Sequence, residues 1–389
     1  MKALFHDVRM KTHASSLSLY LRRIRITKWS TRMIITFFSI IAFSLICLVM
    51  LLSGTLQDVE DLHSSAELQK WEASDTNRTH YGEDLYYSQD LRKWEIPDTD
   101  ILVNDTVSRE LAEKIKVLCF ITTTPKTIQT KARAVNNTWA RRCNKVLFVS
   151  TGTDASPDVL ILKIEESRVH LTAKTIQSLR YIYDNYVEEY HWFLKADDDS
   201  YIVMENLRYL LTHHDHQKPT YMGYHFRMFL EQGYMSGGAG YVMSRKALRM
   251  FIEEGINHKN ESICRTDGPD EDVDVGRCLE AIGVPPYTTT DRLMKETFHP
   301  SGPIGHLTGG LLEYLQRYPK VPIKEGKDCC SQLTISFHYV EPRMMYLIEF
   351  LLYRMTVYGW NTHVDFTGIF KKEVSHIEKE EGFDINALY

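Results

Sequence analysis

The sequence predicts an α/β fold in which helices cover a mostly parallel sheet, and three features support this. Short apolar runs rich in β-branched residues occur in series. A segment with helical spacing lies between the third and the fourth run, as in strand, helix, strand units. An acidic turn follows the fourth run, at the kind of strand end where open α/β sheets bind ligands.

The expected strands and helices follow from the period of the apolar residues. The strands are predicted at 116–123, 145–150, 159–164 and 191–195. A helix is predicted over 171–190, and further helices over 204–213, 244–254, 272–282 and 341–355. Parallel strands in this order are joined by right-handed crossovers.

An uncharged apolar run at 33–52 precedes this pattern and is long enough to span a bilayer. Eight basic residues lie before it against Asp7 alone, so the N-terminus is expected to stay in the cytosol. A cleaved signal peptide is the alternative, but its apolar core would be shorter and nearer the start. We therefore expect a cytosolic tail at 1–32, a transmembrane signal anchor at 33–52, a luminal stem at 53–112 and a globular luminal domain at 113–389.

Charge and cysteine content agree with a luminal domain. The chain carries a formal charge of −5 although its N-terminal tail is basic, so the remainder is acidic and poorly suited to nucleic acid. Six of the seven cysteines lie outside the apolar run and can form three disulfides, whose pairing the spacing leaves open. Zinc is a weaker alternative, because no Cys-x-x-Cys pair exists. Possible glycosylation sequons begin at Asn77, Asn104, Asn136 and Asn260.

The acidic turn Asp197, Asp198 and Asp199 is the main indication of function. Clustered carboxylates at a strand end suit a hard divalent cation that can bind a diphosphate. This predicts group transfer from a nucleotide-activated donor. The alternative is a solvated acidic turn without a ligand.

Two further segments are candidates for the same site. The small residues of 233–244 match no phosphate-binding loop, so they indicate either a tight structural turn or a sugar-binding edge. The acidic run 270–278 opens a predicted helix, where the helix dipole alone could explain it. If one of its carboxylates faces the metal site, it could accept a proton from an acceptor hydroxyl, and Asp272 is our choice.

Two histidines could complete a metal site. His338 lies in an apolar segment at 333–340, and His299 is the competing candidate. A lone histidine in a strand is more often satisfied by a hydrogen bond than by a metal.

Together these segments resemble the core 1 β1,3-galactosyltransferases of glycosyltransferase family 31. The similar blocks are 131–148, 192–199, 233–241, 276–278, 295–300, 329–331 and 336–340. The resemblance covers about 115 to 359. It implies a GT-A fold, a nucleotide-diphospho-sugar transferase architecture, and a catalytic domain at 113–389.

The resemblance also implies a set of site residues. Mn2+ would be held by Asp199 and His338 with Asp197 beside them, and Asp272 would be the base, with Glu271 next to it. Residues 131–139 would line the uridine pocket. The expected donor-binding residues are Lys131, Arg133, Thr138, Trp139, Lys195, Asp197, Asp198, Gly237 and Gly238.

The activity implied is inverting transfer of galactose from UDP-galactose to the 3-hydroxyl of N-acetylgalactosamine on Ser or Thr of a glycoprotein. Such an enzyme would be a single-pass type II protein of the Golgi membrane and could form a homodimer. The alternatives are another glycoprotein or glycolipid acceptor, another donor sugar, or a non-catalytic chaperone-like or lectin role. The intact aspartates argue against the last of these.

The sequence departs from the family where an acceptor would bind. Family members carry a stretch dense in Trp and Tyr before the double cysteine, but here residues 309–319 contain only two tyrosines. This predicts a smaller stacking surface for a sugar or peptide. The segment 267–270 also differs.

Overall fold

The computed structural model describes residues 105–152, 158–258 and 264–355. The predicted tail, the predicted membrane anchor and nearly all of the predicted stem lie outside these ranges. Within them, no helix combines the length and the hydropathy needed to cross a membrane.

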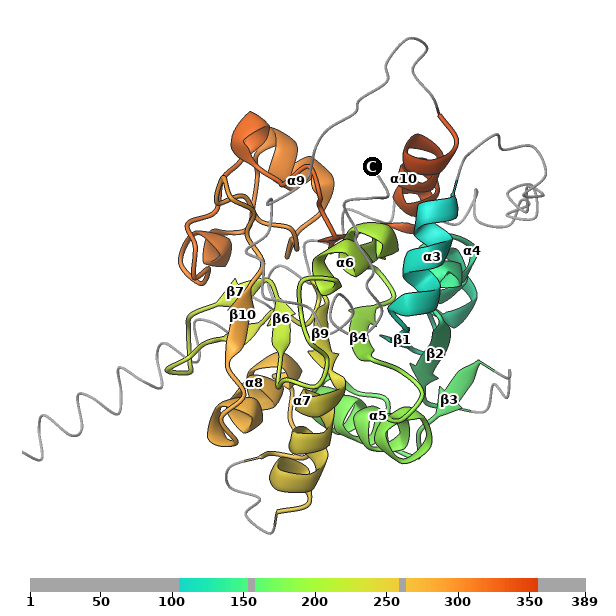
Figure 1. Ribbon diagram of the computed structural model, residues 1–389, viewed down its shortest axis with the longest axis vertical. Coiled ribbons are helices and arrows are strands. Elements are labelled where there is room, and N and C mark those ends of the chain that lie inside the picture. The colour runs from blue at the N-terminus through green and yellow to red at the C-terminus, as the bar shows by residue number, and fades with distance from the viewer. Residues whose placement is uncertain (1–104, 153–157, 259–263, 356–389) are drawn as a thin grey trace, which may run out of the picture. The chain divides into compact units, whose positions relative to one another are not determined.

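The centre of the fold is a seven-stranded sheet with the order β10-β6-β9-β4-β1-β2-β3 (Figure 1). Strand β9 is antiparallel to both of its neighbours, β4 and β6, and the other adjacent pairs are parallel. The strands are β1 (Val117–Thr122), β2 (Lys145–Ser150), β3 (Val159–Ile161), β4 (Trp192–Asp197), β6 (Tyr221–Gly223), β9 (Tyr241–Ser244) and β10 (Pro286–Thr288). The mostly parallel α/β prediction is confirmed.

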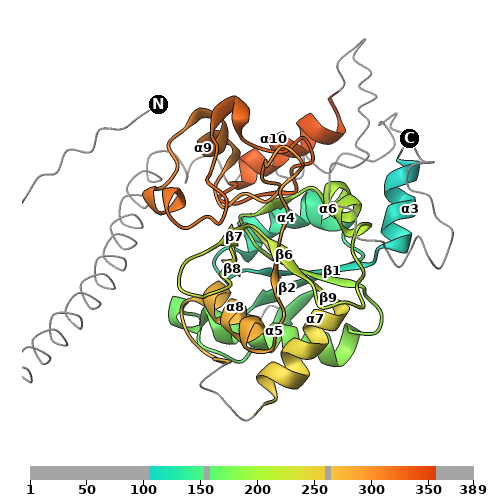
Figure 2. The same cartoon turned by 60° about the vertical axis from the view of Figure 1, so that its left-hand side comes forward.

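Helices cover both faces of this sheet (Figure 2). One face is covered by α5 (Leu171–Tyr186), α7 (Arg245–Met250) with its π-helical extension Phe251–Ile256, and α8 (Glu271–Ala281). On the other side lie α4 (Arg133–Asn137) and α6 (Met204–Leu211), and α3 (Thr106–Lys114) packs beside α6.

The central strands are buried on both faces, which explains their continuous apolar sequence. Leu118 and Phe120 of β1 belong to the core under α5, α7 and α8, whereas Cys119 and Ile121 alternate with them and are equally buried. Each of the four predicted strands and each of the five predicted helices has a counterpart in the structure. The strand predicted around His338 is reduced to two residues.

Two small two-stranded sheets shape the edge where the parallel strands end. The pairs are β5 (Tyr201–Ile202) with β11 (Ser336–Phe337), and β7 (His225–Phe226) with β8 (Tyr234–Met235). The remaining elements are α9 (Pro303–Thr308), α10 (Pro342–Tyr353) and short π- or 3-10 helices at Ile128–Ala132, Trp139–Arg142, Arg168–His170, Glu313–Gln316 and Gly326–Asp328.

Three disulfides are present, as the cysteine count predicted. They join Cys119 to Cys143, Cys264 to Cys278, and the adjacent Cys329 and Cys330. The first links β1 to the segment that leads into β2, and the second ties the chain before α8 to the helix itself.

Candidate functional site

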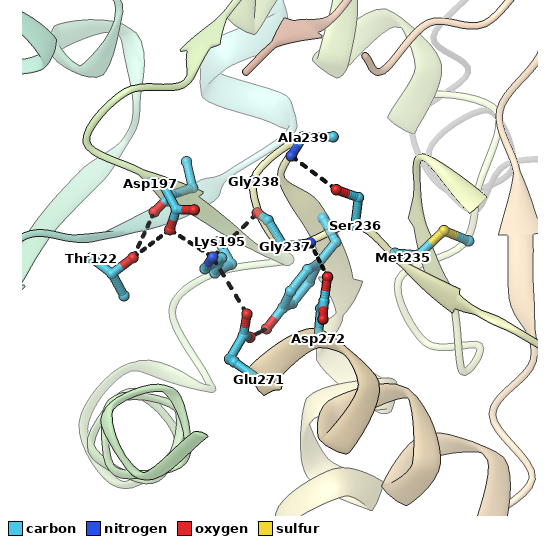
Figure 3. A network of polar contacts seen from close by, with 12 residues as sticks. Thr122, Lys195, Asp197, Met235, Ser236, Gly237, Gly238, Ala239, Glu271 and Asp272 are labelled. Carbon is cyan, nitrogen blue, oxygen red and sulfur yellow. Dashed lines mark hydrogen bonds and ion pairs between the residues drawn. The ribbon is translucent and has the colours of Figure 1, made fainter. Parts of the chain in front are cut away.

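The candidate site lies where β4 leaves the sheet and β9 enters it. Because β9 runs antiparallel to β4, the loop before β9 reaches the same edge as the acidic turn after β4. The first turn of α8 reaches this edge as well, as Figure 3 shows for Asp272 and the Gly237–Gly238 backbone. Three of the predicted segments therefore meet.

Asp197, Asp199 and His338 form the group best suited to a metal ion. Nε2 of His338 lies 3.3 Å from Oδ1 of Asp199 and 3.9 Å from Oδ2 of Asp197. The distant histidine is brought here by β11, which pairs with β5 directly after the acidic turn. The backbone N–H of Val340 also donates to the carbonyl of Asp199 at 2.8 Å.

These residues fit a small divalent cation. One potential ligand atom from each residue lies within 4.8 Å of the other two, and ligands about 2.1 Å from one ion lie roughly 3–4 Å apart. Oδ1 of Asp199 is buried and accepts no hydrogen bond, although Nε2 of His338 lies 3.3 Å away, which leaves this oxygen available to an ion. Carboxylate and imidazole ligands together suit Mn2+.

His299, the competing ligand, lies elsewhere. Its Nδ1 lies 2.8 Å from the carbonyl oxygen of Ser336, and its ring is grouped with the sulfurs of Cys329 and Cys330. Both of those sulfurs are bonded to each other, so they are not thiolates that could ligate a metal. The geometry thus favours His338 over His299 at the acidic turn.

Gly238 makes the position of His338 possible. A Cβ on this glycine would lie 2.0 Å from Cε1 of the His338 ring, so any side chain would displace the imidazole. The glycine-rich segment therefore allows the His338 ring to lie directly against its backbone. The same segment forms a turn in which the N–H of Gly240 donates to the carbonyl of Gly237 at 3.1 Å.

Lys195 joins the two acidic segments (Figure 3). Its Nζ lies 2.7 Å from Asp197 Oδ1 and 3.5 Å from Glu271 Oε2. Although burial by itself lowers the pKa of Lys195, the charges of Asp197 and Glu271 raise it above its usual range. Lys195 is therefore a fixed cation between the two segments. Thr122 also donates to Asp197 Oδ1, at 2.6 Å.

Asp198 and Asp199, the second and third residues of the turn, have pKa values shifted in opposite directions. Burial, reinforced by the neighbouring charge of Asp199, raises the pKa of Asp198 to about 6, and Thr123 donates to its Oδ2 at 2.7 Å. Burial also acts to raise the pKa of Asp199, but His338 and Lys131 outweigh it and hold that pKa well below its usual range. The Asp199 carboxylate is thus favoured in its ionised form.

Asp272 combines a position beside the Gly237 backbone with a raised pKa. Its Oδ2 accepts the N–H of Gly237 at 3.0 Å and its Oδ1 accepts that of Val273 at 2.9 Å. Burial, followed by the adjacent charge of Glu271, raises its pKa to about 7. Glu271 is itself buried and accepts the Tyr241 hydroxyl at 2.6 Å.

The block predicted to line a uridine pocket is partly at the site and partly beneath it. Nζ of Lys131 lies 3.3 Å from Asp199 Oδ2, and Arg133 is half-buried at the start of α4. Thr138 and Trp139 are fully buried, and the indole of Trp139 donates to the carbonyl of Ser200 at 2.8 Å. These two side chains brace the acidic turn from below.

Sequence analysis did not identify Thr122, Thr123 and Tyr241, which orient the site carboxylates. The register of β1 with β4 places Thr122 beside Asp197. Thr122 and Thr123 end the first predicted strand, and parallel strands end at the same edge of a sheet. These two threonines could therefore have been predicted to lie near the acidic turn.

Comparison with known proteins places the site within a recognised sequence family. The model of the Fringe-like family matches residues 112–349, which include every predicted site residue. Glycoprotein-N-acetylgalactosamine 3-beta-galactosyltransferase 1 of Xenopus laevis is 42% identical over 261 residues, 66% of this chain and 71% of the relative.

More distant relatives match over shorter parts of their length. Chondroitin sulfate synthase 3 of Homo sapiens is 30% identical over 181 residues, 42% of this chain and 20% of the relative. Beta-1,3-glucosyltransferase of Mus musculus is 26% identical over 219 residues, 55% of this chain and 39% of the relative.

Proposed function

The chain belongs to the Fringe-like family, and from this premise we propose that it transfers galactose from UDP-galactose to the 3-hydroxyl of N-acetylgalactosamine on Ser or Thr. The proposal extends to this chain the activity named for its Xenopus laevis relative. The observation that carries it is the approach of His338 to Asp199, at 3.3 Å, in the same site as Asp272. The mostly parallel sheet between helices supports the GT-A assignment.

The donor half of the site consists of Asp197, Asp199, His338 and Lys131. Mn2+ held by Asp199 and His338, with Asp197 beside them, would neutralise charge on the diphosphate and so act as a Lewis acid. Lys131 adds a cation next to Asp199. Arg133, on the same helical segment as Lys131, is proposed to contact the uridine, with Thr138 and Trp139 supporting the turn from behind.

The acceptor half consists of Asp272 with Glu271 as its positioning residue. The Asp272 carboxylate accepts the proton of the acceptor 3-hydroxyl while that oxygen forms a bond to the galactose anomeric carbon. The bond from this carbon to the diphosphate breaks on the opposite face, and UDP leaves, so the configuration inverts. A pKa of about 7 suits a group that must take a proton near neutral pH.

The proposed cellular setting follows the sequence prediction. Disulfides are typical of proteins that fold in the secretory pathway, and three are present. We propose a Golgi membrane protein of type II topology whose anchor at 33–52 holds the catalytic domain in the lumen, with a homodimer as its expected assembly.

The test uses the full-length chain purified in detergent. With UDP-galactose, Mn2+ and a peptide carrying α-N-acetylgalactosaminyl threonine, we expect a β1,3-linked galactosyl product by NMR, and no product after chelation. Asp199→Asn should lower the rate at least about a thousandfold without unfolding the protein. Asp158→Asn, on an exposed surface carboxylate, is the matched control.

Failure of the wild-type chain to transfer galactose to any N-acetylgalactosaminyl acceptor would refute the proposal. Competition with UDP-N-acetylglucosamine and UDP-N-acetylgalactosamine separates a different donor sugar from a non-catalytic role, because a chaperone-like protein would release no UDP from any of the three.

A further inference from the structure

Seven aromatic side chains from three separate segments form one connected cluster beside the candidate site, among them Tyr224, whose ring centroid lies 5.3 Å from that of Phe226. Ring centroids are 5.5 Å apart for Phe229 and Tyr318, 5.4 Å for Tyr314 and Tyr318, and 6.4 Å for Phe229 and Tyr234. Phe226 lies at the centre, between 5.6 and 6.4 Å from Tyr234, Tyr314 and Tyr318. The seventh member is Tyr339, which lies near Tyr314: burial first, and then the neighbouring Tyr339, raise the pKa of Tyr314.

The segments are held together by backbone pairing. The N–H of Arg227 donates to the carbonyl of Tyr318 at 2.7 Å, and the N–H of Lys320 donates to that of His225 at 2.8 Å. The segment expected from sequence to offer little stacking surface thus contributes its two tyrosines to a larger aromatic surface built with the β7–β8 hairpin.

This cluster reaches both halves of the proposed active site. On the acceptor side, Tyr234 packs closely against Gly276. A Cβ added to Gly276 would lie 2.5 Å from the Cβ of Tyr234. Gly276 is one helical turn after Asp272, so both residues lie on one face of α8. On the donor side, the ring of Tyr339 stacks on His338 with centroids 3.8 Å apart.

Two members of the cluster are exposed and have a left-handed backbone. Phe229 has a φ of 66° and is 62% exposed, and Tyr339 has a φ of 51° and is 38% exposed. Bulky residues rarely adopt this conformation, and core packing does not account for an exposed ring. The fold therefore holds the Phe229 ring outward at a conformational cost.

We infer that Phe229 binds the aglycone of the acceptor, specifically an apolar peptide side chain next to the glycosylated Ser or Thr. This inference rests on the proposed function. With Asp272 and His338 at the reacting end, the N-acetylgalactosamine ring faces Tyr339 and Tyr314. The peptide attached to the sugar then extends over the hairpin turn that carries Phe229.

A peptide with an apolar side chain is the occupant that this surface fits. Phe229 has no polar atom with which to read sugar hydroxyls, and exposed Met228 lies next to it. Aromatic rings gain most from flat or branched apolar groups that cover their faces. Phe229 is thus a specificity-determining residue and takes no part in the chemical step.

The test variant is Phe229→Gly, which removes the ring and also relieves the left-handed backbone, so it should fold at least as well as the wild type. Phe229→Tyr keeps the ring. Met294→Gly is the matched control, because Met294 has a φ of 57° and is 52% exposed but makes no ring contact with the cluster. Thermal unfolding establishes that all variants fold.

Three acceptors are compared at saturating UDP-galactose, namely a threonine glycopeptide flanked by leucines, the same peptide flanked by alanines, and methyl α-N-acetylgalactosaminide. In the wild type we expect the leucine peptide to have the lowest KM. Phe229→Gly should raise that KM about tenfold, the effect of losing one aromatic contact at an interface. The KM for the methyl glycoside and for UDP-galactose should not change.

An unchanged preference for the leucine peptide in Phe229→Gly, or an equal loss in Met294→Gly, would overturn the inference. A wild-type preference for an N-acetylgalactosaminyl glycolipid over both peptides would overturn it too. Calorimetric binding of the leucine glycopeptide in the presence of UDP tests Phe229 without turnover. No transfer to the methyl glycoside would contradict the proposed function, whereas the loss of peptide preference alone concerns Phe229.

Discussion

The pKa of the Asp272 carboxyl group is raised by the residues that surround it. Burial and the neighbouring Glu271 raise its pKa to about 7, while the N–H groups of Gly237 and Val273 act in the opposite direction. Helix position alone would explain an acidic residue here. A raised pKa at the site edge is the additional property that a general base needs.

This pKa predicts a pH dependence for transfer. The base must be ionised to accept a proton, so kcat should rise about tenfold per pH unit below pH 7 and level off above it. The measurement is kcat at saturating donor and acceptor from pH 5 to 9. Asp272→Asn should bind UDP normally and lose transfer at every pH, and a retained pH profile in this variant would exclude Asp272 as the base.

At the residue scale, the sequence predicted the candidate metal ligands and the candidate base, but not the residues that hydrogen-bond to the site carboxylates and orient them. Asp272 was predicted from its chemistry, whereas Asp199 and His338 as metal ligands followed from the family resemblance, since chemistry alone left His299 as an alternative. Thr122 and Tyr241 were not predicted, because their role depends on which strands are neighbours, and strand order is a long-range property. Trp139 was expected to face a ligand, but it lies buried under Ser200.

At the scale of elements, the approach of the Gly237–Gly240 turn to the segment after β11 fixes the position of the metal group. Gly238→Ala should therefore displace His338, because the added Cβ would overlap its ring. We expect Mn2+ to bind at least about tenfold more weakly, because His338 would no longer be held in position as a ligand. Titration followed by electron paramagnetic resonance measures this affinity.

The control for this variant is Gly305→Ala in α9, where the added Cβ would lie 3.2 Å from the flexible end of Leu311. It should leave Mn2+ binding unchanged. Wild-type affinity in Gly238→Ala would remove His338 from the metal site.

Helix α10 is anchored by one buried carboxylate. Glu349 accepts hydrogen bonds from Arg141 and Arg142 at 2.7–3.0 Å and from the Tyr201 hydroxyl at 2.9 Å. Burial acts to raise the pKa of Glu349, but Arg142 outweighs it and lowers the pKa. Arg141 and Arg142 lie two and three residues after Trp139 in the 3-10 helix Trp139–Arg142, so α10 also supports the acidic turn.

Glu349→Ala should lower the free energy of unfolding by about 3 kcal/mol, because the largely buried guanidinium of Arg142 loses the nearer of its two carboxylate partners. Since the folded pKa is the lower one, this stabilisation is present above the unfolded pKa of Glu and disappears as pH falls through the folded pKa. Denaturant unfolding at pH 7 and at pH 3 measures both effects. Glu313→Ala, in an exposed pair with Arg317, should cost less than about 0.5 kcal/mol.

The sequence predicted the strands that are buried on both faces of the sheet. It did not predict features that depend on which strands pair and in which direction. Strands β1, β2 and β4 read as apolar runs because both of their faces are covered. The direction of β9 left no trace in its sequence, and 244–254 was predicted as one helix although the structure divides it between α7 and a π-helical turn.

For the whole molecule, the disulfides act as constraints on the unfolded chain. The bond between Cys119 and Cys143 closes a loop with a sequence separation of 24 residues. Replacing both cysteines by alanine should lower the free energy of unfolding by about 3 kcal/mol, measured by urea denaturation. If the paired replacement has no effect, the bond does not form in solution.

At this scale the sequence predicted the fold class and the presence of disulfides but not the aromatic cluster. Its seven members come from 224–234, 314–318 and 339, and no local pattern relates them. The pairing of β7 with 318–320 brings the first two segments together, and the pairing of β11 with β5 brings Tyr339 to the same edge.

Because β9 runs antiparallel to β4, the candidate site is built from two separate stretches of the chain. In the proposed function, Lys131, Asp197 and Asp199 of the donor half lie before residue 200, whereas Asp272 and the aromatic cluster lie from residue 224 onward, around and after the β7–β8 hairpin. Substitutions in the later stretch are therefore expected to change acceptor choice while leaving the earlier stretch of the donor half intact. Such an arrangement would let acceptor preference evolve separately from the residues that hold the nucleotide.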